Sequence, residues 1–205
     1  MNKDQHPADT LNEIKVLMER SSKFISLSGL SGIIIGIITI LSVTWFCDHY
    51  AINPFDPNLG QLSNLPSQHY STAFILSLVL LTVSLFTTTL LSVQRARKMG
   101  MQVWGPASRQ LMVNMLVPLS SGIVFCAILF FRTPDLVLPL SLIFYGISLY
   151  GAAKFTHNSV RVFGIIQILL GLICLLFIEY HIIIWTIGFG ICHVIYGAFM
   201  TIKNE

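Results

Sequence analysis

The sequence predicts an all-α membrane protein with six transmembrane helices, and three observations support this. Hydrophobic residues make up 54% of the 205 residues and charged residues 10%, whereas a soluble domain has about 25% charged residues. Six uncharged apolar stretches hold at least 17 residues each, and 17 helical residues cover about 26 Å of a hydrocarbon core roughly 30 Å thick. Runs such as SLVLLTVSLF also lack the alternation of a transmembrane β-strand. The predicted spans are 24–47, 71–94, 111–131, 136–153, 162–178 and 182–202.

The lengths of the connecting segments predict how these spans pair. A 23-residue loop, 48–70, joins the first two spans, and a basic loop, 95–110, joins the second span to the third. About four, eight and three residues connect the last four spans, so consecutive helices must pack antiparallel. We therefore expect a two-helix hairpin followed by an up-down four-helix bundle, together forming one transmembrane domain over 24–205.

Residues 1–23, before the first span, predict a cytoplasmic amphipathic helix that lies on the membrane surface. Thr10 followed by Glu13 forms a capping box, and Leu11, Ile14, Leu17 and Met18 fall on one helical face. Two interpretations remain open for this segment. It is either an anchor on the inner leaflet or a docking site for a cytoplasmic partner.

The distribution of Lys and Arg predicts the orientation in the membrane. If the N-terminus is cytoplasmic, 11 of the 12 Lys and Arg residues lie in cytoplasmic segments and only Arg132 lies in an external loop. An even number of spans then returns the C-terminus to the cytoplasm. The net charge of +3 is thus a topology signal, and we expect the lipid bilayer, not a nucleic acid, as the partner.

Small residues mark the helix faces that we expect to pack closely. In the first span Ser28, Gly32 and Gly36 follow one another at intervals of four residues, and such stripes let helix backbones approach in lipid. This face could pack inside one chain, or against a second copy or another membrane protein. Glycines seven residues apart, and so on one helical face, mark further packing faces in the last two spans, at Gly164, Gly171, Gly190 and Gly197.

Polar side chains inside the spans are the candidate functional residues, because polar groups are costly in hydrocarbon. His193 shares a helical face with Gly190 and Gly197, so we expect its ring to be buried against another span. Counted from the cytoplasmic ends of their spans, polar residues on four helices lie about 5–14 Å deep. They form either a structural hydrogen-bond network or a cytoplasm-facing cavity for a ligand, ion or proton. These residues are Asn114, Tyr145, Ser148, Gln167 and His193.

Pro118 is expected to kink the third span. A proline has no N–H to donate to the carbonyl four residues earlier, and here that carbonyl belongs to Asn114. The freed carbonyl needs another partner within the protein.

The residues that are missing from the spans make coupled transport and haem binding less well supported. All nine Asp and Glu residues lie in termini, loops or span edges, whereas coupled transporters usually need a membrane-embedded carboxylate. Only one histidine is deep in a span, which excludes a bis-histidine haem within one chain. We expect no cofactor.

The cysteines and the outer polar residues give no motif for a metal site. The four cysteines include no C-x-x-C, and we expect buried thiols, although a disulfide between Cys47 and Cys126 remains open. The polar residues of the outer loops fit the membrane interface better than a metal site. These residues are Asp48, His49, His69, Glu179 and His181.

Two stretches resemble an uncharacterised family of small bacterial six-span integral membrane proteins. They are RSSKFISLSGLSGIIIGI at 20–37 and GFGICHVIYGAFM at 188–200. The resemblance implies a location in the bacterial inner membrane, and it makes His193 and the small-residue stripe family features. It implies no mechanism.

The outline of the chain also resembles that of rhomboid intramembrane proteases. Gly146-Ile147-Ser148 in the fourth span and His193 in the sixth would supply a serine and a histidine. The pattern departs at Leu149, where rhomboids have glycine, and the 48–70 loop has no Trp-Arg pair.

The function expected from these features is that of a non-enzymatic multi-pass protein, which acts as a sensor, a ligand-binding protein or a scaffold. The alternative is a small-solute channel or transporter whose pathway passes the polar residues. A rhomboid-like hydrolase that uses Ser148 and His193 ranks third.

The predicted orientation is tested by labelling introduced cysteines. A membrane-impermeant maleimide should label Ser63→Cys in intact cells, because the 48–70 loop is expected to be external. Gln102→Cys, in the basic loop, should react only after permeabilisation. Labelling of Ser63→Cys only after permeabilisation would reverse the topology.

Overall fold

The computed structural model describes residues 29–56, 67–98, 100 and 103–203. These residues form helices and no strand, and six of the helices are long and apolar enough to cross a membrane. The all-α architecture with six spans is therefore confirmed. The amphipathic segment 1–23 and Ser28 lie outside the described residues. The spans run over Gly29–His49, Ser71–Lys98, Ser108–Phe130, Pro134–Phe155, Asn158–Leu176 and Ile178–Ile202.

The elements follow one another with short helical turns at several connections. The long helices are α2 (Gly29–His49), α3 (Ser67–Lys98), α4 (Pro106–Phe130), α5 (Val137–Ala152) and α6 (Asn158–Leu176). The 3-10 turns are η2 (Pro134–Leu136), η3 (Ala153–Phe155) and η4 (Ile178–Tyr180). After η4, the last span continues as α7 (His181–Thr186), η5 (Ile187–Ile191) and α8 (Cys192–Lys203).

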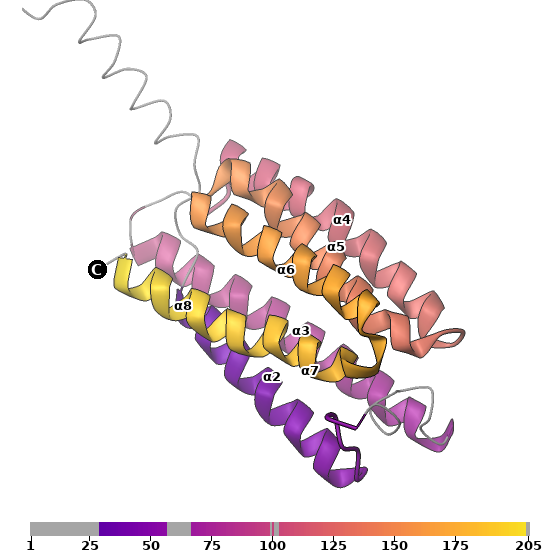
Figure 1. Cartoon of the computed structure of the whole chain (residues 1–205). Helices are drawn as coiled ribbons and strands as arrows, with labels where there is room; N and C mark the ends of the chain where they lie inside the picture. Colours follow the sequence, from indigo (N-terminus) through magenta and orange to yellow (C-terminus); the bar gives the residue numbers. More distant parts are fainter. Residues whose placement is uncertain (1–28, 57–66, 99, 101–102, 204–205) are drawn as a thin grey trace, which may run out of the picture.

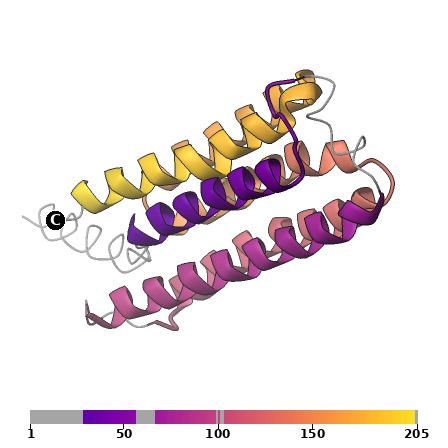
Figure 2. The ribbon, with the colours of Figure 1, turned by 90° about the horizontal axis from the view of Figure 1, so that it is seen from below.

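The helices pack in two groups (Figure 1). Helices α4, α5 and α6 pack in chain order, as their short connections predict. Helix α2 packs mainly along α8, beside which it lies in Figure 2, and only lightly against α3. In the α3 span, none of the residues in the most apolar stretch of 18 is buried against the rest of the chain. The first span therefore pairs with the last span more closely than with the second, unlike in the expected hairpin.

Glycines explain why α2 pairs with α8. A Cβ added at Gly36 would lie 2.6 Å from the Gly190 carbonyl oxygen, and one added at Gly197 would lie 2.5 Å from the Gly29 carbonyl oxygen. Gly32 lies against the backbone of Gly197 as well. Only glycine permits two backbones to approach so closely. The described part of the small-residue stripe is thus covered by α8 of the same chain.

A second glycine contact joins α5 to α6. A Cβ added at Gly164 would lie 2.8 Å from the Gly146 carbonyl oxygen, and one at Gly171 would lie 2.9 Å from the Pro139 carbonyl oxygen. The sequence predicts packing at Gly164 and Gly171. The packing role of Gly146 is not among the sequence predictions. The polar residues described below lie on α5, α6 and the last span, which these glycine contacts help to position.

The last span is not a uniform α-helix. Residues Ile187–Ile191 form a π-helical turn, η5, in which Gly188 and Gly190 are buried. A Cβ at Gly188 would lie 2.5 Å from a methyl carbon of Leu142, and one at Gly190 would lie 2.6 Å from Ile40. Such turns are rare and occur frequently at functional sites. This one divides the span between α7 and α8.

Pro118 does not end the helix in which it lies. Helix α4 continues through Pro118, and the freed Asn114 carbonyl oxygen lies where a Cβ on Gly151 would be only 3.0 Å away.

Cys47 and Cys126 are both free thiols. The Cys126 thiol faces the Val137 carbonyl oxygen at 3.7 Å, so the open alternative of a disulfide is not found.

The substitution Gly36→Leu should separate α2 from α8, because the new side chain meets the Gly190 carbonyl and Val194. We expect a loss of about 1–3 kcal/mol in the free energy of unfolding, measured by denaturant titration in detergent micelles. Thr44→Leu places the same side chain at an exposed position of α2 and should leave stability unchanged. Equal stability of the two variants would show that the α2–α8 contact does not hold the helices together.

Candidate functional site

A hydrogen-bond network centred on the π turn joins three spans. The Tyr145 hydroxyl of α5 lies 2.9 Å from His193 Nε2 of α8. His193 Nδ1 lies 3.1 Å from the Gly188 carbonyl oxygen in η5. The amide nitrogen of Gln167, from α6, donates to the same carbonyl oxygen at 2.9 Å. Two side chains thus end on one backbone carbonyl.

The chemistry of these groups determines where the hydrogens lie. A carbonyl oxygen only accepts hydrogen bonds, so His193 Nδ1 must carry a hydrogen to bond Gly188. In the neutral ring Nε2 is then an acceptor, and Tyr145 donates its hydroxyl hydrogen to it. The network is therefore directional, running from Tyr145 through the imidazole to Gly188.

One polar atom of the network has no hydrogen-bond partner. Gln167 is fully buried, and while its nitrogen donates to Gly188, its Oε1 atom is unpaired. A Cβ at Gly188 would lie 2.9 Å from this oxygen, so the amide fits only because residue 188 is a glycine. A buried unpaired acceptor costs about 1–3 kcal/mol, and in a native structure it calls for an explanation.

Aromatic rings enclose the His193 imidazole, which is 5% exposed. Tyr145 and Phe189 stack near its faces, with ring centroids 5.4 and 5.5 Å away, and Phe163 meets it edge-on at 4.9 Å. Phe163 in turn stacks on Tyr196 at 4.5 Å. The ring is thus held in place on several sides and shielded from lipid.

The three side chains lie at matching depths in their spans. Tyr145 is 10 residues from the Phe155 end of its span, and Gln167 and His193 are each nine residues from the corresponding ends of theirs. At 1.5 Å per residue these separations are roughly 14–15 Å. The arrangement places His193 next to Tyr145 and, through Gly188, next to Gln167.

Ser148, another predicted member, is fully buried but does not join the network. Its hydroxyl donates to the Phe144 carbonyl oxygen of its own helix at 2.7 Å. His193 Nε2 is bonded to Tyr145 instead. The serine and the histidine therefore do not form the hydrogen bond on which a rhomboid-like dyad would depend.

Asn114 also lies apart from the network. It is exposed, and its side-chain nitrogen donates to the Gln110 carbonyl oxygen at 2.8 Å, one turn earlier in α4. Depth alone placed it with the other polar residues. The structure brings together three of the five: Tyr145, Gln167 and His193.

Gly188 is the residue of the network that sequence reasoning did not single out. Its contribution is a backbone carbonyl, which the residue type does not reveal. The one available signal is the close spacing of Gly188 and Gly190 in IGFGI, because two glycines within one turn weaken a regular helix.

The outer polar residues do not gather into a metal site. Within residues 29–56, 67–98, 100 and 103–203, no group of three or more His, Cys, Asp or Glu side chains could hold a metal ion. His49 stacks on Trp45 at 5.1 Å and His69 meets Tyr50 at 4.5 Å. Asp48 is exposed and Glu179 is half-buried. His181 is fully buried, unlike the wetted interface residue that we expected.

Comparisons with protein-family models, curated proteins and solved structures give no match for this chain.

Replacing His193 removes the link between Tyr145 and the Gly188 carbonyl. His193→Leu leaves the Tyr145 hydroxyl without its acceptor and Gly188 without one donor, so we expect the free energy of unfolding to fall by about 1–3 kcal/mol. His193→Gln retains a donor and an acceptor and should lose less. Denaturant titration in micelles measures both. Equal losses for Leu and Gln would mean that packing of the ring, rather than hydrogen bonding, stabilises this region.

Proposed function

We propose that this protein is a non-enzymatic sensor in which the Tyr145–His193–Gly188–Gln167 network binds a small ligand and the π turn η5 responds. The observation that carries the proposal is the convergence of Gln167 and His193 on the Gly188 carbonyl. Two side chains, one of them from another span, form hydrogen bonds to the π turn of the last span. A change in either hydrogen bond acts directly on the backbone of that turn.

The π turn is suited to two arrangements. A π turn differs from an α-helix by one residue in its hydrogen-bond register, so its conversion rotates one part of the span relative to the other. Gly188 and Gly190 lower the barrier to such a change because they lack side chains. A ligand shifts the balance between the two arrangements only if it binds one of them better, as a competitor for the Gly188 hydrogen bonds would.

The unpaired Gln167 oxygen indicates the chemistry of the ligand. A hydrogen-bond donor would satisfy it. Its surroundings include Leu142 and Leu170, both near Gly188, and no charged partner belongs to the network. A charged ligand would therefore lose its hydration without compensation. We infer a small, uncharged molecule that donates a hydrogen bond.

The same geometry gives less support to a channel or transporter. Gln167 and His193 are 0% and 5% exposed, and aromatic rings enclose the histidine. A transport pathway through these residues would require the aromatic enclosure to open on each cycle.

We further place the protein in the bacterial inner membrane with both termini in the cytoplasm. The 11-to-one distribution of Lys and Arg supports the orientation. The resemblance of 20–37 and 188–200 to a bacterial six-span family supports the location.

The proposal is tested by two variants that each remove one hydroxyl from α5. A strain that lacks the gene would be complemented with the wild type, Tyr145→Phe or Ser148→Ala at equal membrane levels, and its transcripts compared. Ser148→Ala should restore the wild-type pattern, because that hydroxyl bonds only its own helix. Tyr145→Phe should not, because His193 Nε2 loses its donor.

Each variant would also be checked for insertion and for its unfolding transition in detergent. Full restoration by Tyr145→Phe would show that the network is structural and not a sensing site. Loss of function in Tyr145→Phe with an unchanged fold would separate sensing from scaffolding, because a scaffold needs only the folded protein.

A further inference from the structure

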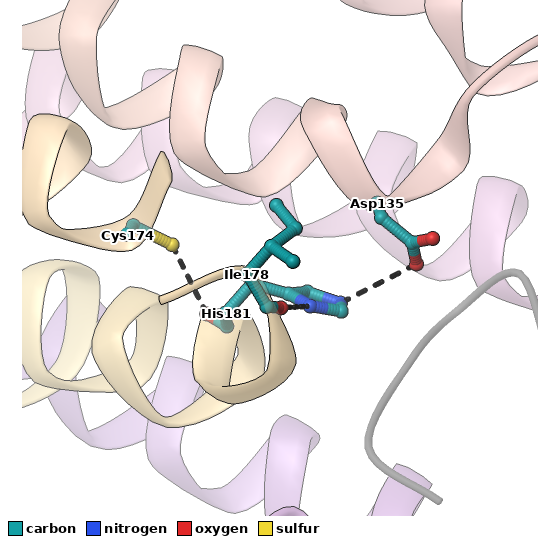
Figure 3. Close-up of polar contacts among 4 residues, drawn as sticks. All are labelled: Asp135, Cys174, Ile178 and His181. Carbon is teal, nitrogen blue, oxygen red and sulfur yellow. Dashed lines mark hydrogen bonds and ion pairs between the residues drawn. The ribbon is translucent and has the colours of Figure 1, made fainter. Parts of the chain in front are cut away.

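A second buried histidine, His181, lies near the start of the last span, on the other side of the π turn η5 from His193. His181 is the first residue of α7 and is 0% exposed. Its Nδ1 atom bonds the carbonyl oxygen of Ile178, as Figure 3 shows. Since a carbonyl can only accept, Nδ1 carries the hydrogen, and in the neutral ring Nε2 has a free lone pair.

This lone pair faces a carboxylate. His181 Nε2 lies 3.9 Å from Asp135 Oδ1, in η2 between α4 and α5 (Figure 3). The separation is too long for a hydrogen bond, and Nε2 has no hydrogen-bond partner. Two acceptor atoms thus point at each other with no hydrogen between them. Such a pair is complementary to one proton.

The groups packed around His181 leave Asp135 as its electrostatic partner. From α6, the Cys174 thiol faces the His181 carbonyl oxygen at 3.7 Å. From α5, Ser141 accepts a hydrogen bond from Trp185, one turn along the last span. On the α2 side, Cys47 packs with Ile182 in an apolar cluster. Asp135 is the charged group that acts on the imidazole.

We propose that His181 and Asp135 form a proton-binding site. One proton from solvent binds at His181 Nε2, while the Nδ1 hydrogen bond to Ile178 is retained. The resulting imidazolium donates to the Asp135 carboxylate, in a charge-assisted hydrogen bond of about 2.7–2.9 Å. Asp135 is 21% exposed, so the proton has a route from the membrane surface.

Proton binding would tie two connections of the bundle together. Asp135 belongs to the link between α4 and α5, and His181 follows the turn that joins α6 to the last span. Shortening the 3.9 Å separation draws these two links toward each other. The site is distinct from the proposed sensing network, because His181 and His193 are 12 residues apart, roughly 18 Å along a helix.

The experiment is nitrogen NMR of the full-length protein in lipid nanodiscs with labelled histidine. The chain contains six histidines, and the His181 signals are identified by their loss in His181→Gln. At neutral pH we expect the tautomer with hydrogen on Nδ1 and a bare Nε2. On acidification Nε2 should gain a hydrogen, and the signal should report a hydrogen bond.

Two variants test the role of the carboxylate. In Asp135→Asn the amide cannot balance an imidazolium, so His181 Nε2 should remain bare over the pH range in which the wild type gains its second N–H. Glu179→Gln removes a carboxylate two residues from His181 and should titrate as the wild type does.

The wild-type protein alone can overturn the proposal. Hydrogen on Nε2 at neutral pH, or an Nε2 that stays bare on acidification, would exclude the proton site whether or not the variants fold. Identical titration of the wild type and a folded Asp135→Asn would likewise exclude the pair. None of these readings depends on the ligand of the Tyr145–His193–Gly188–Gln167 network.

Discussion

The close contact between the backbones of α2 and α8 is the interaction on which the arrangement of the last span depends. A Cβ at Gly36 would lie 2.6 Å from the Gly190 carbonyl oxygen, and one at Gly197 of α8 would lie 2.5 Å from the Gly29 carbonyl oxygen. In lipid, where the hydrophobic effect does not drive helices together, close packing of this kind is one of the interactions that hold helices side by side. Because Gly190 lies in η5 itself, the contact also holds one side of the π turn, while Gln167 and His193 hold its Gly188 carbonyl.

Hydropathy and loop length were sufficient to predict the six spans and the chain-order packing of α4, α5 and α6, because bilayer thickness and short connections leave few alternatives. They were not sufficient to pair α2 with α8. A stripe such as Gly32 and Gly36 shows that a face packs closely but does not identify its partner. Gly190 and Gly197 of the last span were also visible in the sequence, but their positions on one helical face do not show that this face meets Gly32 and Gly36.

The polar residues divide in a way that sequence depth could not anticipate. Tyr145, Gln167 and His193 have side chains long enough to reach another helix, and their rings or amide leave groups that their own helix does not satisfy. Ser148 and Asn114 find acceptors one turn earlier, at Phe144 and Gln110, as short polar side chains in lipid commonly do. Gly188 escaped prediction because its role belongs to the backbone.

The two buried histidines of the last span show how the same residue type can take opposite roles. In both, a backbone carbonyl fixes the hydrogen on Nδ1, so the partner of Nε2 decides the chemistry. His193 Nε2 faces a hydroxyl, which supplies a hydrogen and completes a neutral network. His181 Nε2 faces a carboxylate, which supplies none. A neutral donor favours the uncharged ring, whereas a carboxylate stabilises the charged ring. The first histidine is therefore suited to hold a conformation and the second to register a proton.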